Sequence, residues 1–211
     1  MREEKRQEEI QPIIRQPVSR PFDFSELTVR ASVFATYIIC EDYDSMYLID
    51  QHAAHERIFY EKLLKQFNDS EKYSQKLLLP LIINIPVTAC STEWEETLRG
   101  FAFGFESFGV RTYRFDEIPD FMSLDEAEGF INDFFSAIDE NTDIKSASFL
   151  DKTATRACKS AVKGNQLLDD KEAKALIDAL SLCENPYSCP HGRPVFIKFT
   201  RSQIERMFKR V

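Results

Sequence analysis

The sequence has no long hydrophobic run, no excess of positive charge and no paired set of cysteines. Its longest apolar stretches, Ser32–Cys40 and Leu77–Ile85, are far shorter than the roughly 20 residues that cross a bilayer as a helix. The first residues are polar and charge-mixed, and no apolar segment of the kind found in secretory signals follows them. These absences exclude a helical membrane protein and predict a soluble protein of the cytoplasm.

Five cysteines are scattered along the chain, which fits reduced thiols better than a disulfide framework. The net charge of −8 at pH 7 argues against tight, autonomous binding of nucleic acid, because dedicated DNA-binding domains are usually basic. A nuclease is not excluded, since such sites gather carboxylates for metal ions and DNA affinity can come from another domain.

The patterns that are present mix strands and helices, which predicts an α+β fold (α/β mixed). Strands are predicted at Ser32–Ile39, Met46–Ile49, Leu77–Ile85, Val110–Phe115 and Val195–Phe199. Helices are predicted at Gln51–Phe67, Ser91–Phe103, Leu124–Ile138, Phe149–Gly164, Asp170–Cys183 and Ser202–Arg210. The first two strands are expected to form a hairpin around the polar turn Glu41–Ser45.

The chain also divides by composition. Residues 1–22 are polar and carry Pro12, Pro17 and Pro21, so they are predicted to be a linker that cannot bury enough apolar surface to order itself. Residues 23–69 and 146–211 are predicted to form one subdomain. Residues 70–145 are predicted to form a compact α/β unit inserted within it.

All three histidines fall in two short segments, and the first segment begins at Asp50. His52 and Glu56 are four residues apart and share one face of the predicted helix, with Glu61 off that alignment. Together these side chains offer oxygen and nitrogen ligands for zinc or a harder divalent ion. The alternative is structural, with Asp50 capping the helix and the two glutamates facing solvent.

The second segment is Cys189–Pro194. Cys189 and His191 are separated by a proline and offer a thiolate and an imidazole to one borderline cation. Two ligands from this loop and two from the helix would complete a four-coordinate zinc site. The alternative is a loop turned by Pro190 and Gly192 around a buried cysteine.

Further candidates flank these segments. Cys158 lies on a predicted alanine-rich helix and is either a small buried hydrophobe or a neighbour of the site. Arg57, Lys159 and Arg193 predict a local basic patch for DNA phosphates. The alternative for these cations is a solvated surface that balances nearby carboxylates.

Four elements, in order, resemble the endonuclease motifs of the MutL C-terminal domain family. Asp50-Gln51-His52-Ala53, with Glu56 and Glu61, is similar to the family's DQHA-x2-E-x4-E motif. The other three resemblances are Ala157-Cys158-Lys159 to the ACR element, with lysine for arginine, Cys189–Pro194 to CPHGRP, and Phe208-Lys209-Arg210 to FxR. These elements extend from residue 50 to residue 210 and so cover nearly the whole predicted fold.

The resemblance implies a dimerisation subdomain with an inserted external subdomain, and a homodimer that nicks one strand of duplex DNA in mismatch repair. It implies manganese or magnesium for catalysis, zinc in a regulatory or structural position, and an N-terminal ATPase domain in the same protein as a partner. By matched position, Asp50 and Glu56 would be catalytic, with Cys158 and Glu61 near the site. The metal ligands would be Asp50, His52, Glu56, Cys189 and His191.

The resemblance also implies a second partner. Gln75-Lys76-Leu77-Leu78-Leu79-Pro80 is similar to the Qxx(L/I)xP peptide that binds the replication sliding clamp, with Gln75, Leu78 and Pro80 as the matched positions. The alternative for this segment is an ordinary buried strand. For the chain as a whole, a function of a different class stays open, that of a zinc-stabilised dimerisation and partner-binding module without catalysis.

Overall fold

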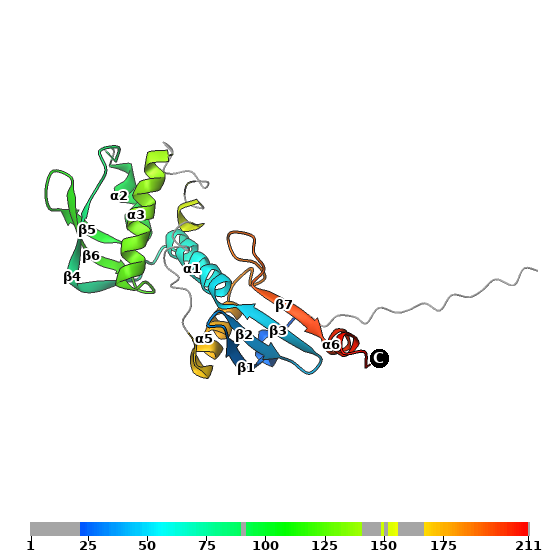
Figure 1. Ribbon diagram of the computed structural model, residues 1–211. Helices are drawn as coiled ribbons and strands as arrows, with labels where there is room; N and C mark the ends of the chain where they lie inside the picture. Colours follow the sequence, from blue (N-terminus) through cyan, green and yellow to red (C-terminus); the bar gives the residue numbers. More distant parts are fainter. Residues whose placement is uncertain (1–21, 90–91, 141–148, 150–151, 156–166, 211) are drawn as a thin grey trace, which may run out of the picture.

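The computed structural model describes residues 22–89, 92–140, 149, 152–155 and 167–210. Two antiparallel sheets, with strand orders β1-β2-β3-β7 and β4-β6-β5, are accompanied by helices (Figure 1). The α+β class predicted from the sequence is confirmed. None of the helices in the described part of the chain is long and apolar enough to cross a membrane.

The four-stranded sheet carries one hydrophobic core on one of its faces. Its strands are β1 (Thr28–Val33), β2 (Tyr37–Glu41), β3 (Ser45–Asp50) and β7 (Phe196–Thr200). Along β2 and β3 every second residue is buried, as expected for strands with one covered face. The buried side chains Ile38, Tyr47 and Ile49 belong to a cluster with residues of α1 (Gln51–Asn68) and α5 (Asp170–Ser181).

The three-stranded sheet carries a second, strongly aromatic core. The strands of this sheet are β4 (Ser74–Asn84), β5 (Gly104–Ser107) and β6 (Thr112–Pro119). The helices that accompany it are α2 (Glu93–Gly100) and α3 (Leu124–Glu140). Phe59 and Leu63, from the middle of α1, also belong to this core. The helix α1 therefore links both cores, and the division at residues 70 and 145 stays a prediction.

One strand prediction was wrong. Ser32–Ile39 is not a single strand, because the chain turns at residues 34–36 between β1 and β2. Phe34 and Ala35 have φ angles of 56° and 50°, the left-handed conformation that tight hairpin turns require. Glycine or asparagine usually marks such a turn, and neither is present here.

A second difference concerns the strand β5, which was not predicted. The helix α2 ends at Gly100 rather than at Phe103, and Ala102 has a φ of 69°. The chain then enters β5 at Gly104, where a Cβ atom would lie 2.8 Å from the Cβ of Glu117. Glycine is thus required for the close pairing of β5 with β6.

The remaining predicted elements lie where expected to within a few residues, and the last helix is α6 (Arg201–Met207). The helix predicted at Phe149–Gly164 falls largely outside the described residues, as does the predicted linker up to residue 21. Phe22, placed in that linker, stacks on Phe196 with ring centroids 4.8 Å apart.

Candidate metal centre

Asp50 marks the junction of β3 and α1. Its Oδ1 accepts a hydrogen bond from the Ala53 N–H at 3.0 Å, so its side chain caps the helix. Its own N–H donates to the Val195 carbonyl at 2.8 Å, which ties this junction to the chain that follows the Cys189–Pro194 loop. The second oxygen, Oδ2, accepts no hydrogen bond from any residue that the structure describes.

Glu56 is a fully buried carboxylate, 0% exposed, on the first turns of α1. Its Oε1 lies 3.0 Å from His52 Nε2, and its Oε2 lies 3.2 Å from His191 Nδ1. One guanidinium nitrogen of Arg193 donates to both oxygens at 2.8 Å. Burial by itself raises the pKa of Glu56, but hydrogen bonds from Arg193 and Cys189 and the positive charge beside it hold that pKa below its ordinary value.

A tight loop brings the other two candidate ligands to Glu56. The Gly192 N–H donates to the Cys189 carbonyl and the Cys189 N–H donates to the Arg193 carbonyl, each at 2.9 Å. Gly192 has a φ of +82°, a conformation that glycine adopts without strain. As a result, Cys189 Sγ lies 3.9 Å from His191 Nδ1. Cys189 is buried, with only 2% of its surface exposed.

The ligand atoms of Glu56, Cys189 and His191 lie within 4.8 Å of one another. In tetrahedral zinc sites, bond lengths of 2.0–2.3 Å place neighbouring ligand atoms roughly 3.3–3.8 Å apart. The separations of 3.2 Å and 3.9 Å at His191 Nδ1 bracket that range. A carboxylate, a thiol and an imidazole are also the donor types that zinc prefers, so these residues fit the ion. His52 is not in the group of three, although it contacts Glu56.

Two other predicted site residues, Glu61 and Arg57, are placed differently. Glu61 contacts the backbone of residues 184 and 185 instead of the ligand group. Arg57 is buried, 8% exposed, and its Nε donates to the Ser188 carbonyl, which does not suit a DNA contact. Cys158 and Lys159 lie outside the described residues.

The predicted clamp-binding segment bulges from its sheet. The ladder between β4 and β6 is interrupted between Lys76 and Leu81, and Leu78 and Leu79 are 102% and 80% exposed. The side-chain nitrogen of Gln75 is already used, since it donates to the carbonyls of Pro119, Asp120 and Met122. The alternative of an ordinary buried strand therefore does not describe this segment.

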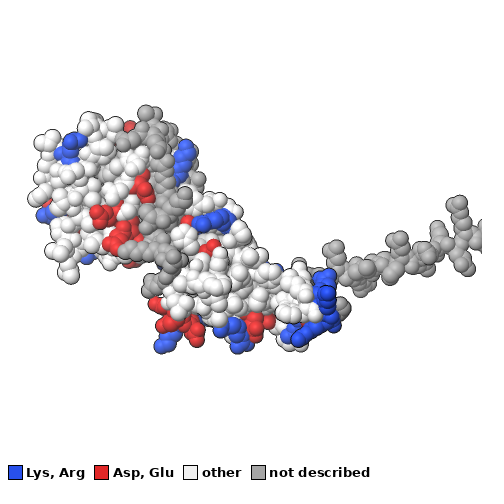
Figure 2. Space-filling view, viewed as in Figure 1, with Lys and Arg blue, Asp and Glu red and all other residues white. Residues whose placement is uncertain are grey.

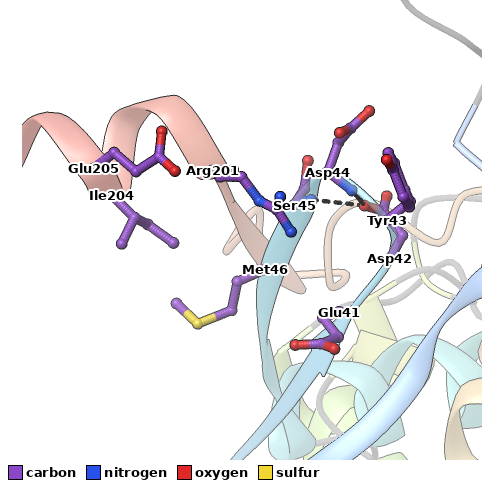
Figure 3. Close-up of a pocket in the computed structure, with 9 residues that line it drawn as sticks. All are labelled: Glu41, Asp42, Tyr43, Asp44, Ser45, Met46, Arg201, Ile204 and Glu205. Atoms are coloured by element: carbon purple, nitrogen blue, oxygen red, sulfur yellow. Dashed lines mark hydrogen bonds between the residues drawn. The ribbon is translucent and has the colours of Figure 1, made fainter. Parts of the chain in front are cut away.

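Two surface features lie away from the ligand group. A hollow between the turn joining β2 to β3 and the helix α6 is lined largely by charged side chains, with Arg201 facing Met46 and the turn (Figure 3). Basic side chains gather at the α6 end of the molecule (Figure 2), where Arg206, Lys209 and Arg210 are exposed. The sequence pattern indicated Phe208-Lys209-Arg210 only as an element similar to FxR, and a basic surface was not predicted here, although the closely spaced cations indicate one.

Comparison with known proteins agrees with the motif resemblance. Residues 30–168 match the family model described as "MutL C terminal dimerisation domain". The chain is 36% identical over 190 residues to "DNA mismatch repair protein MutL" of Caldanaerobacter subterraneus subsp. tengcongensis, and 34% identical over 191 residues to the protein of that name from Lacticaseibacillus casei. Each alignment covers 89% of this chain but only 32% and 29% of the relative, so the chain spans less than a third of their length.

Proposed function

Because this chain belongs to the MutL C-terminal dimerisation domain family, we propose that it is a metal-dependent endonuclease domain that nicks one strand of duplex DNA in mismatch repair. The observation that carries the proposal is the group formed by Glu56, Cys189 and His191. Glu56 lies on the helix that Asp50 caps, and the loop carrying the other two leads to Val195, whose carbonyl accepts from the Asp50 N–H. A carboxylate, a thiol and an imidazole in mutual contact and largely buried are an unusual combination for a purely structural cluster.

The roles follow from the chemistry of each donor. Cys189, His191 and Glu56 would hold zinc, with His52 fixing the orientation of the Glu56 carboxylate through its contact at 3.0 Å. Asp50 has one oxygen committed to the helix cap, and the other is available to a harder ion such as manganese or magnesium. A divalent ion held there would supply Lewis-acid polarisation of the scissile phosphate and would make water a better nucleophile.

A nicking assay on supercoiled plasmid with manganese tests the proposal. Wild-type protein is compared with Asp50→Asn, which keeps the capping geometry, and with Glu205→Gln as a control on α6. We expect nicked circles from the wild type and the control and none from Asp50→Asn. Equal nicking by a folded Asp50→Asn dimer would contradict the assignment of Asp50.

For the dimer interface we propose the face of the four-stranded sheet that α1 and α5 leave uncovered. Ile39 of β2 pairs with Leu48 of β3, which pairs with Ile197 of β7, so the three side chains form an apolar row across the sheet. Ile197 is 52% exposed and the other two are partly exposed. A contiguous apolar row left open in this way is typical of a protein–protein interface.

Sedimentation velocity tests this interface. Ile197→Asp buries a charge in the proposed contact and should shift the domain towards monomer. Val110→Asp, at a site that is 102% exposed in the other sheet's loop, is the matched control and should stay dimeric. An Ile197→Asp protein that dimerises as tightly as the wild type would place the interface elsewhere.

We also propose that the bulge at Leu78, Leu79 and Pro80 docks on the sliding clamp. Its exposed leucines support this, whereas the amide nitrogen of Gln75 is engaged within the domain, so the leucines are expected to carry most of the affinity. Surface plasmon resonance with immobilised clamp should show Leu78→Ala binding at least about tenfold more weakly. Val110→Ala serves as the control, and an unchanged affinity of Leu78→Ala would contradict the proposal.

A zinc-stabilised dimerisation module without catalysis is the second candidate. The cap formed by Asp50 favours it, because that contact gives the residue a structural role independent of chemistry. On this alternative, removing zinc with a chelator unfolds the domain or dissociates the dimer, and Asp50→Asn changes neither property.

A further inference from the structure

The contacts of Glu61 and Arg57 give these two residues a use other than ligation or DNA binding. We propose that they are positioning residues that anchor the segment carrying Cys189 and His191 to α1, and so set the affinity of the site for metal. The inference rests on the proposed metal site. It concerns how the protein holds two of the three ligands, a property separate from the chemistry.

Glu61 holds the start of that segment. The N–H of Glu184 donates to Glu61 Oε2 at 2.6 Å, and the N–H of Asn185 donates to Oε1 at 3.0 Å. Hydrogen bonds from N–H groups to an ionised carboxylate are stronger than those between neutral partners. Both oxygens of Glu61 are thereby committed to the backbone, four and five residues before Cys189.

Arg57 holds the middle of the segment. Its Nε donates to the Ser188 carbonyl at 2.6 Å, directly before Cys189, and another guanidinium nitrogen lies 3.6 Å from Glu61 Oε1. The guanidinium also lies over the Tyr60 ring, 5.4 Å from its centroid. With the Arg57 side chain only 10% exposed and that of Glu61 19% exposed, the pair is sheltered from competing water.

The far end of the segment is also fixed, because the Val195 carbonyl accepts from the Asp50 N–H at 2.8 Å. The loop is therefore held at its start, middle and end by α1 and the residue that caps it. Glu56 and Glu61 lie on the same helix, five residues and about 7.5 Å of helical rise apart. Since a helix is stiff over this length, it fixes the distance between one ligand and the anchor of the other two.

Loss of the anchor should release the loop and weaken binding that depends on Cys189 and His191. Residues that orient metal ligands typically contribute about 10- to 100-fold in affinity. Glu61→Leu removes both acceptors and should lower affinity by a factor in that range. Glu61→Gln keeps one acceptor oxygen and should lower it less.

Cobalt(II) titration of the full chain, in competition with a chelator, tests the inference. The charge-transfer band between thiolate and cobalt reports bonding by Cys189, and nicking activity plays no part in the readout. Glu128→Leu, at an exposed carboxylate of α3, is the matched control and should leave the affinity unchanged. Circular dichroism and sedimentation verify that each variant is folded, and Glu61→Gln replaces Glu61→Leu if the latter does not fold.

A double-mutant cycle separates positioning from general stability. If Glu61 acts through the loop, Glu61→Leu should have less than about a twofold effect on cobalt affinity once both Cys189 and His191 are replaced by alanine. In that background, which has no band from thiolate and cobalt, the absorbance of the competing chelator reports the affinity. An equal loss of affinity in both backgrounds, or no loss in the wild-type background, overturns the inference while the metal site stands. A wild-type protein that gives no band from thiolate and cobalt overturns the metal site as well.

Discussion

Asp50 caps α1 and is proposed to act in catalysis, and substitutions can distinguish these two roles. Asp50→Asn retains an oxygen that can accept from the Ala53 N–H, whereas Asp50→Ala removes the cap altogether. Losing a capping side chain costs about 1 kcal/mol of stability, with a range of roughly 0.5–2. Losing the negative charge at the helix N-terminus costs a further 0.3–1 kcal/mol, roughly, in either variant.

Asp50→Asn should therefore lose less than about 1 kcal/mol, and Asp50→Ala about 1–2 kcal/mol in total. In a domain of this size, each kcal/mol lowers the melting temperature by about 2–4 °C. Differential scanning calorimetry measures both shifts, and the plasmid assay measures nicking by the same samples. Both variants should fail to nick, although only Asp50→Ala loses the cap.

The reasoning about the cap would be refuted if the two variants melted at the same temperature. The reasoning about catalysis would be refuted if Asp50→Asn nicked as well as the wild type. Because the melting temperature and the nicking activity are measured independently, the capping role or the catalytic role can be refuted while the other stands.

Three further predictions concern the fold and its titrating groups. Phe130→Ala removes a ring that is 0% exposed from the aromatic core and should cost about 3–5 kcal/mol in urea unfolding, and a loss below about 1 kcal/mol would contradict the packing described. Burial raises the thiol pKa of Cys40 to about 11 and that of Cys183 to about 12, so native protein at neutral pH should be alkylated far more slowly than unfolded protein, as mass spectrometry can measure. Although burial alone raises the pKa of Asp42, hydrogen bonds from Tyr47 and two backbone N–H groups lower it overall. Its contribution to stability is thus present above the unfolded-state pKa of about 3.9 and lost as pH falls through the lower folded-state value, and Asp42→Asn should flatten this part of the urea-unfolding pH profile.

Periodic patterns and motif spacing predicted much of this molecule. Apolar spacing located α1, α3 and α5 because each has a covered face, and the concentration of histidines located the segments that meet at Glu56. The turn at Phe34 and Ala35 was not predictable from composition, because neither residue type usually adopts positive φ.

Contacts between distant segments were the other part that the sequence did not reveal. Motif spacing placed Glu61 beside the ligands, but the path of the chain through residues 184–188 determines that it bonds to backbone instead. The pairing of Arg193 with Glu56 and the bulge that exposes Leu78 likewise depend on tertiary structure. Sequence spacing constrains neighbours on one helix and says little about which side chain a loop will meet.

An anomalous difference map at the zinc absorption edge, from a crystal grown with zinc, tests the central claim most directly. The account predicts a peak bonded to Cys189 Sγ at about 2.3 Å, to His191 Nδ1 at about 2.0–2.1 Å and to a carboxylate oxygen of Glu56. No peak at this position, or a zinc ion held by other side chains, would contradict it.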